Sequence, residues 1–168
     1  MTDTPKPLNV LFLCTHNSAR SILAEALLNH MGQGRFKAFS AGSSPRDHQQ
    51  PNPLGLRTLQ AAGIPTDGLR SKSWDEFASP SAPQMDLIIT VCDNAAGEVC
   101  PFWPGHPATA HWGYADPSEG QGSDEEKLQA FRQTLHLIKR RLESLIQLPE
   151  DKLQRALLQT TARELAKD

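Results

Sequence analysis

Residues 14–21 are the segment of this 168-residue chain whose side chains are best suited to chemistry. The segment places a cysteine and an arginine with five residues between them and reads Cys14-Thr15-His16-Asn17-Ser18-Ala19-Arg20-Ser21. Successive backbone N–H groups of so short a loop can point inward and bind a tetrahedral oxyanion. Arg20 can place its guanidinium on two oxygens of the same anion. Such a positive field favours the thiolate of Cys14, to which Ser18 or Ser21 could donate a hydrogen bond. The spacing therefore indicates nucleophilic thiol chemistry on an oxyanion.

The sequence on either side of this segment predicts the elements that would position it. Residues 8–13 are almost all apolar, which is typical of a strand buried on both faces. Over residues 19–31 apolar side chains recur at helical spacing, and Gly32 then provides a stop. The helix would direct the positive end of its dipole at the anion. The structural alternative is that Cys14 is a buried cysteine at a strand end and Arg20 a solvated helix residue.

The rest of the chain predicts strands alternating with helices. Further strands are expected at residues 35–41, 85–91 and 108–112, and further helices at residues 52–62, 123–146 and 150–167. Ser123 followed by Glu126 is a capping-box signature for the helix that begins there. The alternation predicts an α/β fold, an open, doubly wound, four-stranded parallel sheet with helices on both faces, plus an extra C-terminal helix. Residues 1–148 are expected to form one domain, with residues 149–168 as its helical extension.

Composition argues against several classes of protein. Lys plus Arg number 17 against 19 Asp plus Glu, a net charge of −2, whereas nucleic-acid-binding domains usually carry a basic excess. Three cysteines suit a cytosolic protein with reactive thiols better than a disulfide-stabilised secreted one. No stretch approaches the ~20 apolar residues of a membrane span, and the first residues lack the apolar core of a signal peptide. We therefore expect a cytoplasmic protein that binds neither nucleic acid nor membrane.

Residues 14–21, continuing into Ala24-Glu25-Ala26, resemble the phosphate loop and first helix of the low-molecular-weight protein tyrosine phosphatase superfamily. Asp116-Pro117 resembles the loop that carries the general acid there, and the resemblance extends over roughly residues 8–146. It implies that Cys14 is the nucleophile, that residues 15–21 bind the substrate and that Asp116 protonates the leaving oxygen. His16 stands where many members have glycine, and histidine is among the residues that better tolerate a positive φ.

Two more cysteines, Cys92 and Cys100, follow the strand predicted over residues 85–91. In a parallel sheet the end of that strand lies at the same edge as Cys14, so Cys92 could attack a sulfur there. The segment between Cys92 and Cys100 could then carry Cys100 towards Cys92 and pass the disulfide on. Such a relay suits the reduction of arsenate. The alternatives are an inert core thiol at Cys92 and a simple surface thiol at Cys100.

Four stretches look like the three-cysteine arsenate reductases of this superfamily, namely Cys92-Asp93-Asn94, Cys100-Pro101, His111-Trp112 and Ala115-Asp116-Pro117. The resemblance implies the reduction of arsenate to arsenite, with phosphate as a competing anion and no bound cofactor. The catalytic residues would be Cys14, Arg20, Cys92, Cys100 and Asp116. Electrons would come from a transient redox partner, either thioredoxin or glutaredoxin with glutathione. Cys92 and Cys100 have seven residues between them, one more than in the best-known thioredoxin-coupled members, which leaves both donors open.

Two other functions stay open. The first is a phosphomonoesterase that uses Cys14 and Asp116. It is disfavoured because Ser118-Glu119-Gly120 follows the acid loop, without the tyrosines that line the phosphotyrosine pocket of the phosphatases. The second is a non-enzymatic thiol or metal sensor, for which the chain offers no basic surface run or DNA-reading helix.

Two sets of residues have the character of metal ligands. The set that could hold zinc comprises Cys92, Cys100, His106 and His111. Structural zinc sites usually have two to four residues between their cysteines, so this spacing fits poorly. The set that resembles a structural potassium site of some reductases in the superfamily comprises Asn17, Glu25 and Ser40. Because no fourth carboxylate is evident over residues 71–74, no metal site is predicted.

Overall fold

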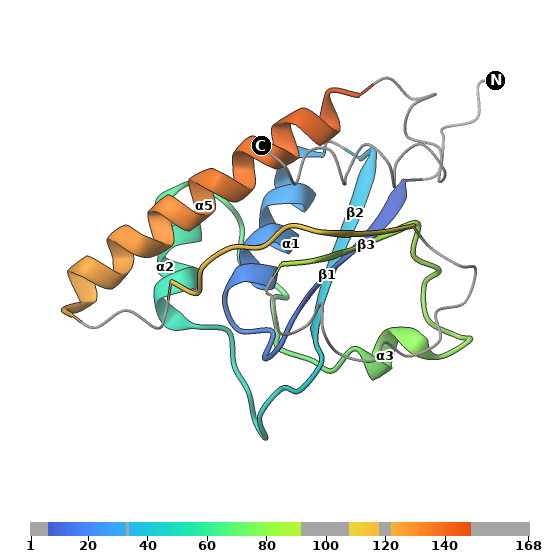
Figure 1. Cartoon of the computed structure of the whole chain (residues 1–168), viewed down its shortest axis with the longest axis horizontal. Helices are drawn as coiled ribbons and strands as arrows, with labels where there is room; N and C mark the ends of the chain where they lie inside the picture. Colours follow the sequence, from blue (N-terminus) through green and yellow to red (C-terminus); the bar gives the residue numbers. More distant parts are fainter. Residues whose placement is uncertain (1–6, 33, 92–107, 118–121, 149–168) are drawn as a thin grey trace.

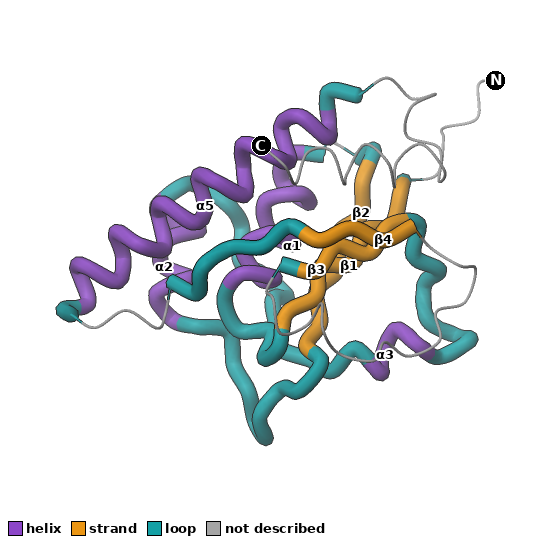
Figure 2. Tube along the Cα trace, in the orientation of Figure 1, coloured by secondary structure: helices purple, strands orange, loops and turns teal. Residues whose placement is uncertain are grey.

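The computed structural model describes residues 7–32, 34–91, 108–117 and 122–148. Its strands are β1 (Leu8–Cys14), β2 (Phe36–Gly42), β3 (Leu87–Thr90) and β4 (Ala108–His111). They form one sheet in the order β2-β1-β3-β4 and lie side by side in Figure 2. Each neighbouring pair is parallel, so each connection has to cross over a face of the sheet. The predicted four-stranded parallel sheet is confirmed.

The central strand β1 carries its apolar run because both of its faces are covered. Residues 10–13 are fully buried. The last residue of the strand, Cys14, pairs with Gly42 at the end of β2, and Leu13 pairs with Thr90 at the end of β3. The carboxyl ends of three strands thus meet beside Cys14, which is where open α/β sheets bind their ligands.

Three helices cover one face of the sheet, as Figure 1 shows: α1 (Arg20–Met31), α2 (Pro53–Ala61) and α5 (Asp124–Ile146). Helix α1 contacts β1, β2, α2 and α5, and α5 also contacts α2. Their inward side chains form the larger hydrophobic core with Val10 and Phe12 of β1. Helices α2 and α5 therefore hold α1, and with it the loop between Cys14 and α1, against the sheet.

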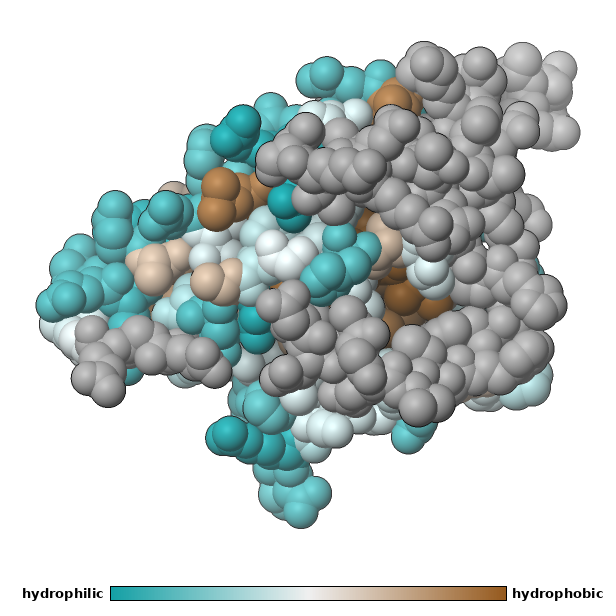
Figure 3. Space-filling view, viewed as in Figure 1, coloured by the Kyte–Doolittle hydropathy of each residue, from teal (hydrophilic) through white to brown (hydrophobic). Residues whose placement is uncertain are grey.

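Helix α5 follows the amphipathic pattern of its sequence. Phe131, Ile138 and Leu142 are fully buried, whereas the side of the helix visible in Figure 3 is mostly hydrophilic. Ser123 caps the helix, because its Oγ accepts a hydrogen bond from the N–H of Glu126 at 3.3 Å. The predicted start of this helix at a Ser123 cap is confirmed, and the Glu126 carboxylate accepts from the Ser123 hydroxyl at 3.4 Å.

The opposite face is covered by a segment that the sequence did not predict as regular structure. A single turn of helix, α3 (Asp75–Ala78), lies there, and Trp74 and Phe77 pack against Leu11 and Leu13 of β1. A four-residue helix is too short to show a periodic pattern of apolar residues. The fold is thus doubly wound as predicted, with a very short helix on this face.

Most predicted boundaries agree with the structure to within one or two residues. Helix α2 lies within the predicted range 52–62, and the Asn52 side chain caps it by accepting from the N–H of Leu54 at 2.9 Å. Strand β3 covers only the central part of the predicted range 85–91. The helix predicted over residues 150–167 lies outside the described residues. Within the described ranges, none of the helices combines the length and the apolar character that a membrane crossing requires.

Candidate active site

The loop between β1 and α1 is tied to the rest of the protein through its carbonyl groups. The carbonyl oxygen of Cys14 accepts a hydrogen bond from the N–H of Ser43 at 3.0 Å. The carbonyl oxygen of Thr15 accepts from the N–H of Ser44 at 2.8 Å. Both donors follow directly after β2, so the parallel pairing of β1 with β2 brings them to the loop.

Two further carbonyl groups of the loop also accept hydrogen bonds from other segments. The carbonyl oxygen of Asn17 accepts from the hydroxyl of Ser71 at 2.6 Å, and that of Ser18 accepts from the N–H of Asn52 at 2.8 Å. A planar trans peptide directs its C=O and its N–H to opposite sides. The N–H groups of residues 15, 16, 18 and 19 therefore point away from these donors, an arrangement (a nest) that suits the binding of an oxyanion by backbone N–H groups.

The sulfur of Cys14 lies at hydrogen-bond distance from two groups of this loop. The backbone N–H of Asn17 donates to Sγ at 3.2 Å, and Oγ of Ser21 lies 2.9 Å from Sγ. The side-chain amide of Asn17 donates to Oγ of Ser21 at 2.8 Å, and with Cys14 ionised the Ser21 hydroxyl is the donor to the sulfur, because a thiolate has no hydrogen to give. Two donors aimed at one sulfur favour its thiolate. Of the two hydroxyls considered from the sequence, the structure places that of Ser21 at the sulfur.

Asn17 gives the loop its turn. Its φ is 57° and its side chain is fully buried. The backbone N–H of Lys72 donates to Oδ1 of Asn17 at 2.9 Å, which orients the amide so that its N–H₂ group faces Ser21. Asparagine is among the residues that best tolerate the left-handed region. The positive φ considered for His16 is therefore found one residue later.

Gly42 allows the loop to lie against the end of β2. A Cβ at this position would lie 2.7 Å from the carbonyl oxygen of Thr15 and 2.9 Å from the carbonyl carbon of His16. Both are backbone atoms, so no side chain fits here without moving the loop. Gly42 directly follows the strand predicted over residues 35–41, and no role was predicted for it. The signal for its role was a glycine at the end of the strand that neighbours Cys14.

Arg20, the first residue of α1, joins the loop to the segment that follows β4. Its Nη1 donates to the carbonyl oxygen of Tyr114 at 2.9 Å, and its Nη2 lies 3.6 Å from Oδ2 of Asp116. Both charged side chains are mostly buried. An open cleft of about 340 Å³ lies beside them, lined in part by His16, Ser18 and Asp116. The structure thus brings the predicted acid and the predicted anion-binding arginine to the same loop.

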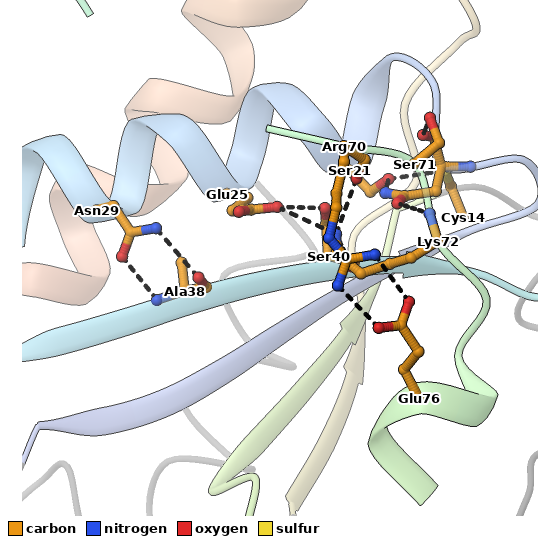
Figure 4. A network of polar contacts seen from close by, with 11 residues as sticks. Cys14, Ser21, Glu25, Asn29, Ala38, Ser40, Arg70, Ser71, Lys72 and Glu76 are labelled. Atoms are coloured by element: carbon orange, nitrogen blue, oxygen red, sulfur yellow. Dashed lines mark hydrogen bonds and ion pairs between the residues drawn. The ribbon is translucent and has the colours of Figure 1, made fainter. Parts of the chain in front are cut away.

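A polar cluster lies behind the loop, between α1 and β2, and Figure 4 shows its members converging. The hydroxyl of Ser40 donates to the carboxylate of Glu25. Nζ of Lys72 donates to the carbonyl oxygen of Ser40 at 2.8 Å and lies 3.9 Å from Oε1 of Glu25. Burial raises the pKa of the Glu25 carboxyl and lowers the pKa of the Lys72 ammonium, while their mutual attraction opposes both shifts.

These contacts bear on the potassium site that the sequence resembles. Oδ1 of Asn17 accepts from the backbone of Lys72, the hydroxyl of Ser40 donates to Glu25, and the Lys72 ammonium approaches the Glu25 carboxylate. A positive charge therefore already lies among the residues that would hold the ion, so a potassium ion does not fit this arrangement. Lys72 and Ser71 had no sequence signal, because their contacts depend on a connection of irregular structure.

Three predicted residues, Cys92, Cys100 and His106, lie outside the described residues. The fourth member of the zinc set, His111, is described, and its Nδ1 lies 2.6 Å from Oγ1 of Thr90. Among the described residues no group of three or more His, Cys, Asp or Glu side chains is arranged to hold a metal ion.

Comparison with known proteins gives consistent matches. The chain matches the family model described as low molecular weight phosphotyrosine protein phosphatase over residues 9–159. It is 33% identical over 133 residues to the arsenate reductase of Bacillus subtilis (strain 168), a match that covers 79% of this chain and 91% of that protein.

Solved structures agree with these matches. The arsenate reductase of Archaeoglobus fulgidus DSM 4304 superposes with a TM-score of 0.62 and 29% identity, covering 82% of this chain and 98% of that chain. A thioredoxin-dependent arsenate reductase of Corynebacterium glutamicum superposes with a TM-score of 0.55 and 26% identity, covering 84% of this chain and 65% of that chain.

Proposed function

The chain belongs to the low molecular weight phosphotyrosine protein phosphatase family, among its arsenate reductases, and we propose that it reduces arsenate through a relay of its own three cysteines. The observation that carries the proposal is the loop of residues 14–21. Its carbonyl groups accept hydrogen bonds from other segments, which leaves its N–H groups suited to an oxyanion, and the Asn17 N–H and the Ser21 hydroxyl lie at hydrogen-bond distance from the sulfur of Cys14.

The first step follows from this geometry. The thiolate of Cys14 attacks As(V) of arsenate held by the nest and by Arg20, and a sulfur–arsenic bond forms. One arsenate oxygen leaves as water, with Asp116 as the group that protonates it. Nη2 of Arg20 lies 3.6 Å from Oδ2 of Asp116, so an anion held in the nest by Arg20 would also lie close to the Asp116 carboxyl. Phosphate has the same tetrahedral shape and charge, and it competes for the nest.

The reducing step is assigned to Cys92. Its thiolate attacks the sulfur of Cys14, a Cys14–Cys92 disulfide forms, and the electron pair of the sulfur–arsenic bond stays on arsenic, which leaves as arsenite. Cys100 then attacks Cys92, so that the disulfide moves to Cys92–Cys100 and the Cys14 thiolate is regenerated. An external dithiol finally reduces that disulfide and is itself oxidised.

The backbone directly before Cys92 supports this assignment. The N–H of Val91 donates to the carbonyl oxygen of Leu13 at 2.8 Å, so the residue before Cys92 is bonded to the residue before Cys14. The carbonyl oxygen of Val91 accepts from the N–H of Tyr114 at 3.2 Å, which ties the acid-bearing segment to the same point. Cys92 follows this junction directly in the sequence.

We assign the external dithiol to a thioredoxin or to glutaredoxin with glutathione, acting in the cytoplasm. The Corynebacterium glutamicum neighbour is described as thioredoxin-dependent, which favours thioredoxin. The reaction needs no bound cofactor, because the cysteines themselves carry both electrons.

Two assays test the function: arsenite release from arsenate with a thioredoxin system as electron donor, and hydrolysis of a phenyl phosphate. We expect rapid arsenite formation with at most slow phosphate release. Cys14→Ser should abolish both activities, since a serine hydroxyl is not ionised near neutral pH. Efficient phosphoester hydrolysis without arsenite formation would instead assign a phosphatase.

A further inference from the structure

Lys72 contacts the loop and the sheet through its backbone. Its carbonyl oxygen accepts from the N–H of Gly42 at 2.8 Å, at the end of β2, and its N–H donates to Oδ1 of Asn17 at 2.9 Å. The residue before it, Ser71, donates its hydroxyl to the carbonyl oxygen of Asn17 at 2.6 Å. Residues 71–72 therefore hold both the side chain and the backbone of Asn17.

The ammonium of Lys72 lies among oxygen atoms, as a bound cation would. It donates to the carbonyl oxygens of Ser40 at 2.8 Å and Arg70 at 2.9 Å, and it faces the Glu25 carboxylate at 3.9 Å. The Lys72 side chain is 8% exposed and that of Glu25 is 15% exposed, so water screens their attraction weakly. Removing the ammonium would leave the Glu25 charge buried without this cation.

We propose that the Lys72 ammonium is a built-in monovalent cation that fixes the anion-binding loop, at the place where some reductases of this superfamily hold a potassium ion. Lys72 is a positioning residue, because it acts on the sulfur of Cys14 only through other groups. The ammonium binds the carbonyl oxygens of Ser40 and Arg70 and so holds the Lys72 backbone in place. From there the path runs from the backbone N–H of Lys72 to Oδ1 of Asn17, from the Asn17 amide to Oγ of Ser21, and from Ser21 to the sulfur. The inference extends the proposed function, on which it rests for the role of the loop.

The native protein should not respond to potassium, because its cation is covalently part of the chain. Lys72→Ala should open a space beside Glu25 and Ser40 of a size that a potassium or ammonium ion could enter. The variant should then lose the order of the loop, and either ion should restore it.

The experiment compares potassium chloride, ammonium chloride and choline chloride at equal ionic strength. One readout is the rate at which iodoacetamide alkylates Cys14 at pH 6, measured by peptide mass spectrometry. The other readout is the melting temperature. We expect the wild type to behave alike in all three salts. In choline, Lys72→Ala should alkylate about tenfold more slowly, equivalent to about one unit in the thiol pKa, and either small cation should restore the rate.

Lys37→Ala is the matched control, since Lys37 is an exposed residue of β2 over the Phe39 ring. It should change none of these rates. A wild type that melts at a higher temperature in potassium than in choline would overturn the proposal. This comparison uses the wild type alone, so it holds even if Lys72→Ala does not fold. A slow variant that neither cation restores, or an unchanged variant, would overturn it as well. Neither readout needs arsenate, so a failure to release arsenite would reject the proposed function alone.

Discussion

At the scale of single residues, the reactivity of Cys14 rests on the groups that donate to its sulfur. Ser21 is one of them, with Oγ 2.9 Å from Sγ, and the Asn17 amide donates to the same Oγ at 2.8 Å. A thiolate can only accept, so with Cys14 ionised the Ser21 hydroxyl donates to the sulfur. Ser21 therefore supports the thiolate rather than competing with it.

We predict that Ser21→Ala slows the alkylation of Cys14 at pH 6 by about tenfold, which corresponds to the loss of one hydrogen bond to a charged group. The arsenite release rate should fall in parallel, because the same thiolate attacks arsenic. Iodoacetamide kinetics on both variants measure the effect. Ser144→Ala is the control, since Ser144 is an exposed serine of α5. Equal rates in the two variants would show that Ser21 does not support the thiolate.

At the scale of elements, the loop and strand β2 depend on close backbone contact at Gly42. We predict that Gly42→Ala destabilises the protein by about 1–3 kcal/mol, because its Cβ has to displace the backbone of Thr15 and His16. Under conditions in which the variant is fully folded, its rate of arsenite release should fall by more than tenfold, because the nest is distorted. Urea unfolding and steady-state kinetics measure the two effects.

Gly68→Ala separates the two effects of Gly42→Ala. Gly68 has a φ of +79°, and a Cβ added there would meet no atom within 4 Å, so alanine costs about 1–2 kcal/mol of backbone strain without touching the loop. We expect this control to lose stability and keep its activity. If Gly42→Ala keeps its activity as well, close packing of the loop on β2 is not required for catalysis.

The sequence allowed prediction of those parts of the site that are contiguous in the chain. The apolar strand, the loop of residues 14–21 and the amphipathic helix α1 follow one another, so local patterns were sufficient. The contacts of Gly42, Lys72 and the Tyr114 carbonyl were not predictable, because each joins segments far apart in the chain. Such contacts depend on how strands lie beside one another rather than on any residue pattern.

At the scale of the whole molecule, stability should depend on pH through Tyr114. Burial raises the pKa of its phenol above the ordinary value of 10.0, so the unfolded chain ionises first as the pH rises. The folded state then binds more protons than the unfolded state, and the free energy of unfolding falls above about pH 10.

We predict that Tyr114→Phe reduces this alkaline loss of stability, measured by urea unfolding at pH 7 and pH 11. Its activity at neutral pH should stay close to wild type, because Arg20 binds the backbone oxygen of Tyr114 and not its ring. The same loss of stability in wild type and variant would refute the link to this phenol.

In the proposed relay, the three cysteines of one molecule deliver two electrons to arsenic and pass the resulting disulfide outward. Mass spectrometry of non-reduced peptides after a single turnover, with glutathione present, tests it most directly. We predict that Cys100→Ser releases one arsenite per enzyme and accumulates a Cys14–Cys92 disulfide, whereas the wild type carries the disulfide on Cys92 and Cys100. A wild type with glutathione on Cys14, and with Cys92 and Cys100 both free, would contradict the relay.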